Sequence, residues 1–311
     1  MIQVTRSSPP FSKPLPRLVV ASALLSFSWC LEGPNPAVAQ EYPDLALRQQ
    51  IESRIRGFKG EVGVYVRHLE TGASVDIDAN KIFPTASMVK LPLLVSLYDH
   101  VERGALDLEA RLTYHDSLHY GGDDDIINKM RPGETVTLSK LAFFMISTSD
   151  NTASLWIQGL LTGAAVNEWL SANGFQATRV NSRVDGRRED WERYGWGQTT
   201  PREMAELLVR IREGRAVSAH ASEEMYRTLT KSYWDDEALS ALPPTVQVAS
   251  KQGAVSASRS EVLLVNAPTG DYVLCMITNN QEDRGWEADN EGFALLRDIS
   301  SIVYHHFVDG E

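Results

Sequence analysis

Three short polar motifs follow one another along this chain. They are Ser87-Met88-Val89-Lys90, then Ser149-Asp150-Asn151, then Lys251-Gln252-Gly253. A serine hydroxyl is a weak nucleophile at neutral pH and needs a neighbouring base. A lysine three residues further on lies on the same face of a helix as that serine. Because the three motifs occur in a fixed order, the set predicts acyl transfer through a serine ester.

The first motif is predicted to open a helix. Pro84 and Thr85 precede it, and an apolar face continues from Leu91 to Tyr98. The backbone N–H of Ser87 can then form half of an oxyanion hole, because helix N-termini present free N–H groups. Lys90 can act as a base only if it is partly desolvated or lies near other cations. The alternative is a capping serine with a surface lysine.

The second motif lies between two apolar helical runs, 138–146 and 152–161. We expect Ser149 to relay a proton toward the leaving nitrogen, and Asn151 to hydrogen-bond a substrate amide. Asp150 is expected to point inward and to accept backbone N–H bonds. The alternative is an N-cap of the second helix, which these residue types favour, and both interpretations can hold together.

The third motif follows the alternating strand pattern of residues 246–249. Gly253 and Ala254 are small, which allows the backbone of a peptide-like substrate to add to the strand edge. We expect Lys251 to supply positive charge to a substrate carboxylate and to proton transfer, and Arg259 to be able to do the same. The alternative for both cations is a solvated strand face.

These motifs resemble those of the class A β-lactamase-like serine hydrolases, within the wider group of serine penicillin-recognising proteins. The similarity runs in order from about Asp44 to Phe307. Its segments are Pro84–Lys90, Met145–Ala153, Thr199–Met204 and Val248–Gly253. The resemblance implies a serine hydrolase that hydrolyses β-lactam amide bonds. Related alternatives are a D,D-peptidase, esterase or amidase on another substrate, or a non-hydrolytic penicillin-binding protein.

Two departures from the family's pattern bear on the activity. Gln252 stands where the family usually has Thr or Ser, and it cannot supply a hydroxyl. The family's Glu-Pro-x-Leu-Asn segment, which holds the deacylating water, is absent from the Ω-like stretch 179–201. Val184 falls about where the family has its Glu. Asp185 is therefore the first candidate for a deacylating base and Glu189 the second, and deacylation is expected to be slow.

The predicted fold is α/β. Helical patterns at 44–58 and near the C-terminus enclose strand patterns at 61–77 and 246–279. Strands from both chain ends imply one antiparallel sheet backed by the terminal helices. The resemblance implies a β-lactamase/transpeptidase-like architecture with an α/β part of about 40–80 and 202–311, a helical part of about 81–201, and the active site between them.

Composition is typical of a secreted enzyme with one large core. The chain has 311 residues, of which 43% are hydrophobic. Basic residues, an apolar run from Leu18 to Leu31 and Ala37-Val38-Ala39 predict a signal peptide over residues 1–39, with cleavage near Ala39. The formal net charge is −11, and the leader carries a net +2, so the mature chain carries −13. This acidity argues against nucleic acid and anionic membranes as partners.

We expect no cofactor, because serine acyl transfer needs none. No metal site is expected either, since His115 and His119 lack an evident third ligand. The expected partner is a small-molecule β-lactam or a D-Ala-D-Ala-like peptide, bound by a secreted or periplasmic monomer without a stable membrane anchor. Tyr120 lies where the family often has an aromatic wall of the cleft, and the alternative is packing in the core or on the surface. The run Asp123–Asp125 is expected to form a solvated loop.

Overall fold

The computed structural model describes residues 40–120 and 125–310, which belong to one compact unit. The predicted signal peptide and its cleavage site lie outside the described residues. The α-helices are α1 (Leu45–Ile55), α2 (Lys90–Glu102), α3 (Leu138–Ser147), α4 (Asn151–Leu161), α5 (Gly163–Ala172), α6 (Arg188–Tyr194), α7 (Pro201–Arg212), α8 (Ala219–Leu229) and α9 (Glu291–Asp309). No helix among them is both long enough and apolar enough to cross a membrane.

The main sheet has six strands in the order β1-β3-β2-β11-β10-β9. The strands are β1 (Tyr42–Pro43), β2 (Glu61–His68), β3 (Ala73–Ile77), β9 (Val248–Val255), β10 (Ser258–Ala267) and β11 (Gly270–Asn279). All neighbours pair antiparallel except β1 and β3, which are parallel. The prediction of one sheet built from both chain ends is therefore confirmed, and β9 forms its edge.

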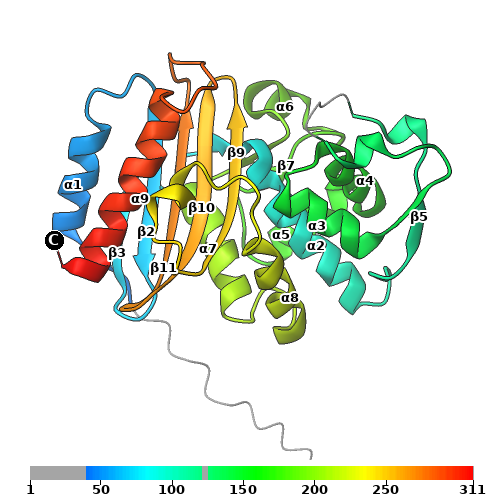
Figure 1. Cartoon of the computed structure of the whole chain (residues 1–311), viewed down its shortest axis with the longest axis horizontal. Coiled ribbons are helices and arrows are strands. Elements are labelled where there is room, and N and C mark those ends of the chain that lie inside the picture. The colour runs from blue at the N-terminus through cyan, green and yellow to red at the C-terminus, as the bar shows by residue number, and fades with distance from the viewer. Residues whose placement is uncertain (1–39, 121–124, 311) are drawn as a thin grey trace, which may run out of the picture. The chain divides into compact units, whose positions relative to one another are not determined.

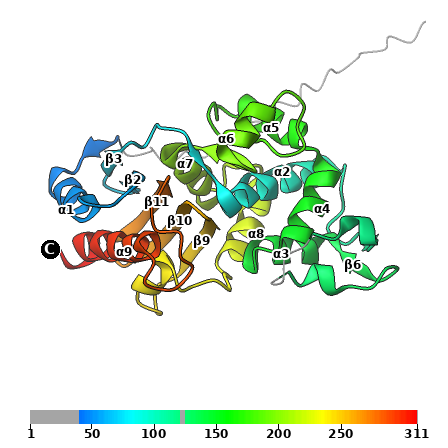
Figure 2. The same ribbon diagram turned by 90° about the horizontal axis from the view of Figure 1, so that it is seen from above.

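The sheet buries apolar side chains on both faces. In β11, Leu274 and Met276 join one core, and Val273, Cys275 and Ile277 join the other. This follows from the alternation of side chains along a strand. The terminal helices α1 and α9 cover the first face, whereas α7 and the helical part lie on the second (Figures 1 and 2). The active-site motifs face the second core.

Polar caps fix the helix boundaries that the sequence indicates. Asp44, Thr137 and Thr200 each accept a hydrogen bond from the backbone N–H three residues further on, at the starts of α1, α3 and α7. Such caps satisfy backbone donors that have no intrahelical partner. The helix predicted to open at Ser87 differs, because a short 3₁₀ turn, η1 (Ala86–Val89), precedes α2.

Short elements that the sequence did not indicate hold the Ω-like stretch in place. A three-stranded sheet joins β4 (Phe83–Pro84), β8 (Gly197–Thr199) and β7 (Arg179–Val180), with β8 in the middle. The two ends of the Ω-like stretch, β7 and β8, therefore pair with each other. β8 also pairs with β4, the strand just before Ser87. A second small sheet pairs β5 (Arg111–Thr113) with β6 (Thr135–Thr137).

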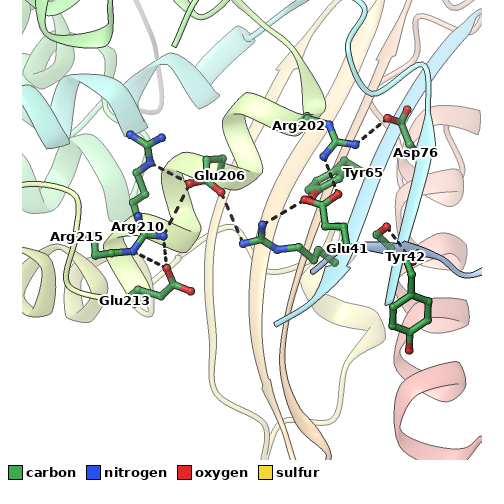
Figure 3. Close-up of polar contacts among 11 residues, drawn as sticks. Glu41, Tyr42, Tyr65, Asp76, Arg202, Glu206, Arg210, Glu213 and Arg215 are labelled. Atoms are coloured by element: carbon green, nitrogen blue, oxygen red, sulfur yellow. Dashed lines mark hydrogen bonds and ion pairs between the residues drawn. The ribbon is translucent and has the colours of Figure 1, made fainter. Parts of the chain in front are cut away.

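A network of ion pairs ties α7 to the sheet (Figure 3). Arg202 donates to Glu41 and to Asp76, at 2.9 Å each, and its guanidinium carbon lies 4.3 Å from the ring centroid of Tyr65. Further along α7, Glu206 pairs with Arg210 at 2.9 Å. This network links the start of α7, which follows the Ω-like stretch directly, to Glu41, just before the edge strand β1, and to Asp76 on the neighbouring strand β3.

Candidate active site

Ser87 lies in a strained turn against the edge strand of the sheet. The preceding residue, Ala86, has a φ of 45°, a left-handed conformation that residues with a Cβ rarely adopt. Thr85 N donates to Gly197 O at 3.0 Å, so β8 supports the turn from behind. A Cβ built on Gly253 would lie 2.8 Å from Ser87 N and 2.7 Å from Thr85 O. Only glycine at this position of β9 lets the nucleophile's turn approach so closely.

Lys90 is buried beneath Ser87. Its Nζ lies 3.1 Å from Ser87 Oγ, 2.9 Å from Ser149 Oγ and 2.8 Å from Asn151 Oδ1. Burial lowers the pKa of the Lys90 amine well below its usual range, and the charge of Lys251 lowers it further. Lys90 is therefore not a surface lysine. A neutral amine here can accept the Ser87 proton.

The Ser149-Asp150-Asn151 loop joins α3 to α4. Asp150 points inward as expected: its Oδ1 accepts from Ala153 N at 2.7 Å, and its Oδ2 accepts from Ile126 N and Ile127 N. Asp150 is thus the N-cap of α4 and also anchors the facing segment. Ser149 has a φ of 58°, and this conformation accompanies the contact of its side chain with Lys90.

Asp125 is a functional-site residue that sequence reasoning missed. It was expected in a solvated loop, yet it is 4% exposed. Its carboxylate accepts from Asn151 N at 2.8 Å, and from Thr152 N and Thr152 Oγ1 at 2.9 Å each. It therefore fixes the backbone at Asn151 and Thr152. Asp123 and Asp124 lie outside the described residues.

Lys251 completes the cationic centre. Its Nζ lies 3.2 Å from Ser149 Oγ and donates to Gln252 O at 3.0 Å and to Gln252 Oε1. Burial lowers the pKa of Lys251 to about 7, although Glu237 and Glu261 favour its charged form. The hydroxyl of Ser149 thus lies between two buried amines, which suits a proton relay.

Arg259 is not in this centre. In the β9–β10 register it pairs with Ala254, whereas Lys251 pairs with Val262. It therefore points to the other face of the sheet, where its guanidinium carbon lies 4.5 Å from the ring centroid of Phe293 on α9. Arg259 is fully buried there and lines neither of the cavities beside Ser87.

Two cavities meet at Ser87. We call the first, of about 420 Å³, the leaving-group lobe, because Ser149 and Gln252 line it together with Trp234. We call the second, of about 470 Å³, the acyl lobe, because Asn151 and Ala254 line it together with Tyr120, Tyr194 and Trp196. Asn151 and Ala254 line both lobes. Tyr120 is among the residues that line the acyl lobe and is 45% exposed.

The Ω-like stretch contributes aromatic side chains, not acids, to the described lining. Asp185 and Glu189 are exposed and line neither lobe. Val184 packs against α5. A Cβ built on Gly163, the first residue of α5, would lie 2.4 Å from Val184 Cγ2. The structure therefore does not bring Asp185 or Glu189 to Ser87. Trp196 lies there instead, with its ring centroid 5.6 Å from Lys90 Nζ.

Comparison with known proteins places this arrangement in a family. The sequence model of the Beta-lactamase enzyme family matches residues 46–307, which is most of the chain. The chain belongs to that family. It is a class A β-lactamase-like serine hydrolase.

Individual relatives of this β-lactamase family member are distant in sequence. The chain is 20% identical to β-lactamase VEB-1 of Pseudomonas aeruginosa, over 85% of this chain and 91% of the relative. It is 26% identical to β-lactamase AER-1 of Aeromonas hydrophila, over 85% and 86% of the two chains.

Solved structures of the family share the fold. A PBP-A variant, solved as an acyl-enzyme complex with penicillin G, aligns with a TM-score of 0.77 and 26% identity, covering 87% of this chain and 99% of that one. An ancestral class A β-lactamase aligns with a TM-score of 0.73 and 23% identity, covering 84% of this chain and all of that one. The β-lactamase/transpeptidase-like architecture that the sequence predicted is confirmed.

Proposed function

We propose that this protein hydrolyses β-lactams through an acyl-enzyme on Ser87, and that it releases the acyl group slowly. The observation that carries this proposal is the position of Lys90 Nζ, within 3.1 Å of the hydroxyls of both Ser87 and Ser149. One buried base therefore touches both the nucleophile and the group that can return its proton.

Acylation begins when neutral Lys90 accepts the Ser87 proton. Ser87 Oγ attacks the β-lactam carbonyl, and the backbone N–H of Ser87 stabilises the developing oxyanion. The proton then passes from Lys90 through Ser149 to the leaving nitrogen, and the amide C–N bond breaks. Lys251, 3.2 Å from Ser149 Oγ, favours the negative charge that builds up on this path.

The remaining predicted site residues hold the substrate. Asn151, which lines both lobes, is suited to bind the substrate's side-chain amide. Gly253 and Ala254 lie on the free edge of β9, where an extended substrate can pair with backbone groups. Tyr120 forms part of the wall of the acyl lobe.

Deacylation needs a water molecule and a base to activate it. Lys90 is the base nearest to the ester, but its amine already donates to Ser149 Oγ and to Asn151 Oδ1. The described lining of the acyl lobe contains no carboxylate, and Trp196 occupies its Ω-like side. This supports slow turnover of the acyl-enzyme.

A D,D-peptidase is the second candidate function. The aromatic Ω-like wall favours it, because a peptidase can pass its acyl group to an amine and does not depend on a strongly activated water. The free β9 edge suits an extended peptide. PBP-A, which carries penicillin G as an acyl-enzyme in one solved variant, is among the similar structures.

Intact mass spectrometry over time tests these functions. The purified protein is mixed with benzylpenicillin, and separately with a chromogenic cephalosporin. A transient adduct with continuing colour formation supports the β-lactamase, whereas a persistent adduct supports the peptidase. The variant S87A serves as the control and should form no adduct. An undiminished adduct on that variant would contradict the assignment of the nucleophile.

We also propose that the enzyme is exported and acts as a monomer without a membrane anchor. The leader pattern over residues 1–39, with cleavage near Ala39, supports export, and residues 40–311 would then form the mature catalytic domain. Sequencing the N-terminus of the protein from the extracellular or periplasmic fraction, followed by sizing in solution, tests both parts.

A further inference from the structure

Trp286 is a large aromatic side chain in the wall of the leaving-group lobe. It lies in the connection between β11 and α9, is 60% exposed, and lines the lobe together with Trp234 and Ala288. So exposed a side chain adds little to the hydrophobic core, because most of its apolar area stays in water. Aromatic side chains are, by contrast, common in the walls of small-molecule sites.

A buried cation holds the indole in place. The guanidinium carbon of Arg259 lies 4.4 Å from the ring centroid of Trp286 and 4.5 Å from that of Phe293. Arg259 is fully buried and donates to Ser258 O at 3.0 Å and to Gly285 O at 2.5 Å. The cation–π attraction of a fixed guanidinium therefore orients the ring of Trp286 from one side. Much of the remaining ring surface stays accessible to a ligand.

The connection that carries Trp286 is itself fixed by hydrogen bonds. Asp283 Oδ1 accepts from Gly285 N at 2.9 Å, and Asp283 Oδ2 accepts from Glu291 N at 2.8 Å. Asn290 Nδ2 donates to Asp283 O at 3.2 Å. The indole is thus preorganised, and little entropy is lost in ordering the protein when a ligand stacks on it.

A second tryptophan, from another part of the chain, lines the same lobe. Trp234 lies between α8 and the 3₁₀ turn η4 (Ala238–Ala241) and is half-buried. Its Nε1 donates to Thr148 O at 2.8 Å, and Tyr233 N donates to Ser147 O at 2.8 Å. The segment before the Ser149 loop therefore fixes this indole. Two separately anchored indoles contribute flat apolar surface to one cavity.

We propose that Trp286 determines substrate specificity, by binding a planar aromatic or heteroaromatic ring on the leaving-group side of a β-lactam. Such a ring can stack on the accessible surface of the indole while the lactam carbonyl lies at Ser87. One ligand can reach both, because Ser87 and Trp286 line the same cavity of about 420 Å³. The inference rests on the proposed acylation of Ser87 and names a substrate class for it.

Two cephalosporins with the same thienylacetyl acyl side chain test the proposal. Nitrocefin carries a dinitrostyryl group at C3 of its dihydrothiazine ring, where cephalothin carries an acetoxymethyl group. The second-order rate constant for acylation is measured by stopped-flow absorbance and divided by each probe's rate of alkaline hydrolysis. W286A should lower the nitrocefin-to-cephalothin ratio about threefold to tenfold, the usual scale for loss of one aromatic stacking pair. W286F keeps a ring and should leave the ratio within about twofold of wild type.

W191A is the matched control. Trp191 is also an exposed indole beside an arginine, with the guanidinium carbon of Arg188 5.6 Å from its ring centroid, but it lines neither lobe. Its ratio should therefore stay within about twofold of wild type. Urea denaturation of both alanine variants separates binding from shielding. An indole that only covers Arg259 would affect the free energy of unfolding and leave the ratio unchanged.

An unchanged ratio in W286A would overturn the proposal, and so would an equal fall in W191A. A further measurement does not need acylation. In equilibrium dialysis, the double variant S87A/W286A should bind nitrocefin about threefold to tenfold more weakly than S87A does, and equal binding would again overturn the proposal. Absence of an adduct with both probes in wild-type protein would contradict the proposed acylation instead, which keeps the two failures distinct.

Discussion

The amine of Lys90 faces the indole ring of Trp196, with the Nζ 5.6 Å from the ring centroid. The ring is held in place, because Trp196 Nε1 donates to Gln158 Oε1 at 2.6 Å, and Gln158 Nε2 donates to Ser182 O at 2.6 Å. The Ω-like stretch thus presents a fixed aromatic wall to the catalytic base. The sequence predicted a deacylating acid from this same Ω-like stretch.

This wall predicts acylation that is faster than deacylation. A chromogenic cephalosporin should give a burst of colour close to one equivalent of enzyme, followed by slow turnover. The substitutions D185N and E189Q should leave the adduct lifetime within about twofold, because both side chains are exposed and line neither lobe. Stopped-flow absorbance and intact mass measure the two phases. A lifetime lengthened tenfold by either substitution would show that the loop does reach the ester.

Replacement of Lys90 tests the base. Arginine keeps the charge and the approximate length but cannot give up its proton at ordinary pH. K90R should therefore slow adduct formation by about two orders of magnitude or more, the usual scale for loss of a general base. The rate of mass shift with benzylpenicillin measures it, with circular dichroism as the control for folding. A rate within a few-fold of wild type would assign proton acceptance to another group.

The depressed pKa of Lys90 also predicts how acylation depends on pH. The working form is the neutral amine, so the acylation rate should fall as pH decreases through the Lys90 pKa. The charge of Lys251 helps to keep that pKa low. In K251M the Lys90 pKa should rise, and the acidic limb of the rate profile should move to higher pH. An acidic limb that stays in place, or moves to lower pH, would contradict this coupling of the two amines.

The sequence predicted the main sheet because its signals are local. Runs of β-branched and apolar residues at 61–68 and 272–279, with turn residues between strands, specify both strands. It did not predict β4, β7 and β8, because strands of two or three residues are set by tertiary pairing and carry no periodicity of their own.

The sheet face on which Arg259 lies could not be predicted from the sequence alone. The two-residue turn Ser256-Ala257 sets the register that pairs Arg259 with Ala254, and one residue more or less would reverse the face. Asp125 was missed for a different reason. Its partners are backbone N–H groups of residues 151 and 152, so only the folded chain brings donor and acceptor together.

The ion pairs of Arg202 should contribute measurably to stability. R202M removes contacts with Glu41 and Asp76 and the stacking on Tyr65, and we expect a loss of about 1–2 kcal/mol in the free energy of unfolding, reduced by partial exposure. The control is R227M, which removes an exposed pair with Glu223, and should cost less than about 0.5 kcal/mol. Urea denaturation measures both. Equal losses would show that the network adds nothing beyond a surface pair.

The close approach of η1 to β9 makes Gly253 sensitive to a single methyl group. In G253A the added Cβ would meet Ser87 N at 2.8 Å, Thr85 O at 2.7 Å and Ser260 Oγ at 2.9 Å. Because two of these atoms belong to the backbone of the nucleophile's turn, Ser87 must move, and acylation should fall about tenfold or more. The rate of adduct formation with benzylpenicillin measures this.

The matched control for that substitution is G159A, on the exposed face of α4, where nothing lies within 4 Å of the added Cβ. There alanine should leave acylation unchanged and raise the free energy of unfolding by about 0.5–1 kcal/mol, because alanine favours a helix more than glycine does. If G253A acylated at the wild-type rate, the turn would have to yield without displacing Ser87. The tight contact between η1 and β9 would then not be what positions the nucleophile.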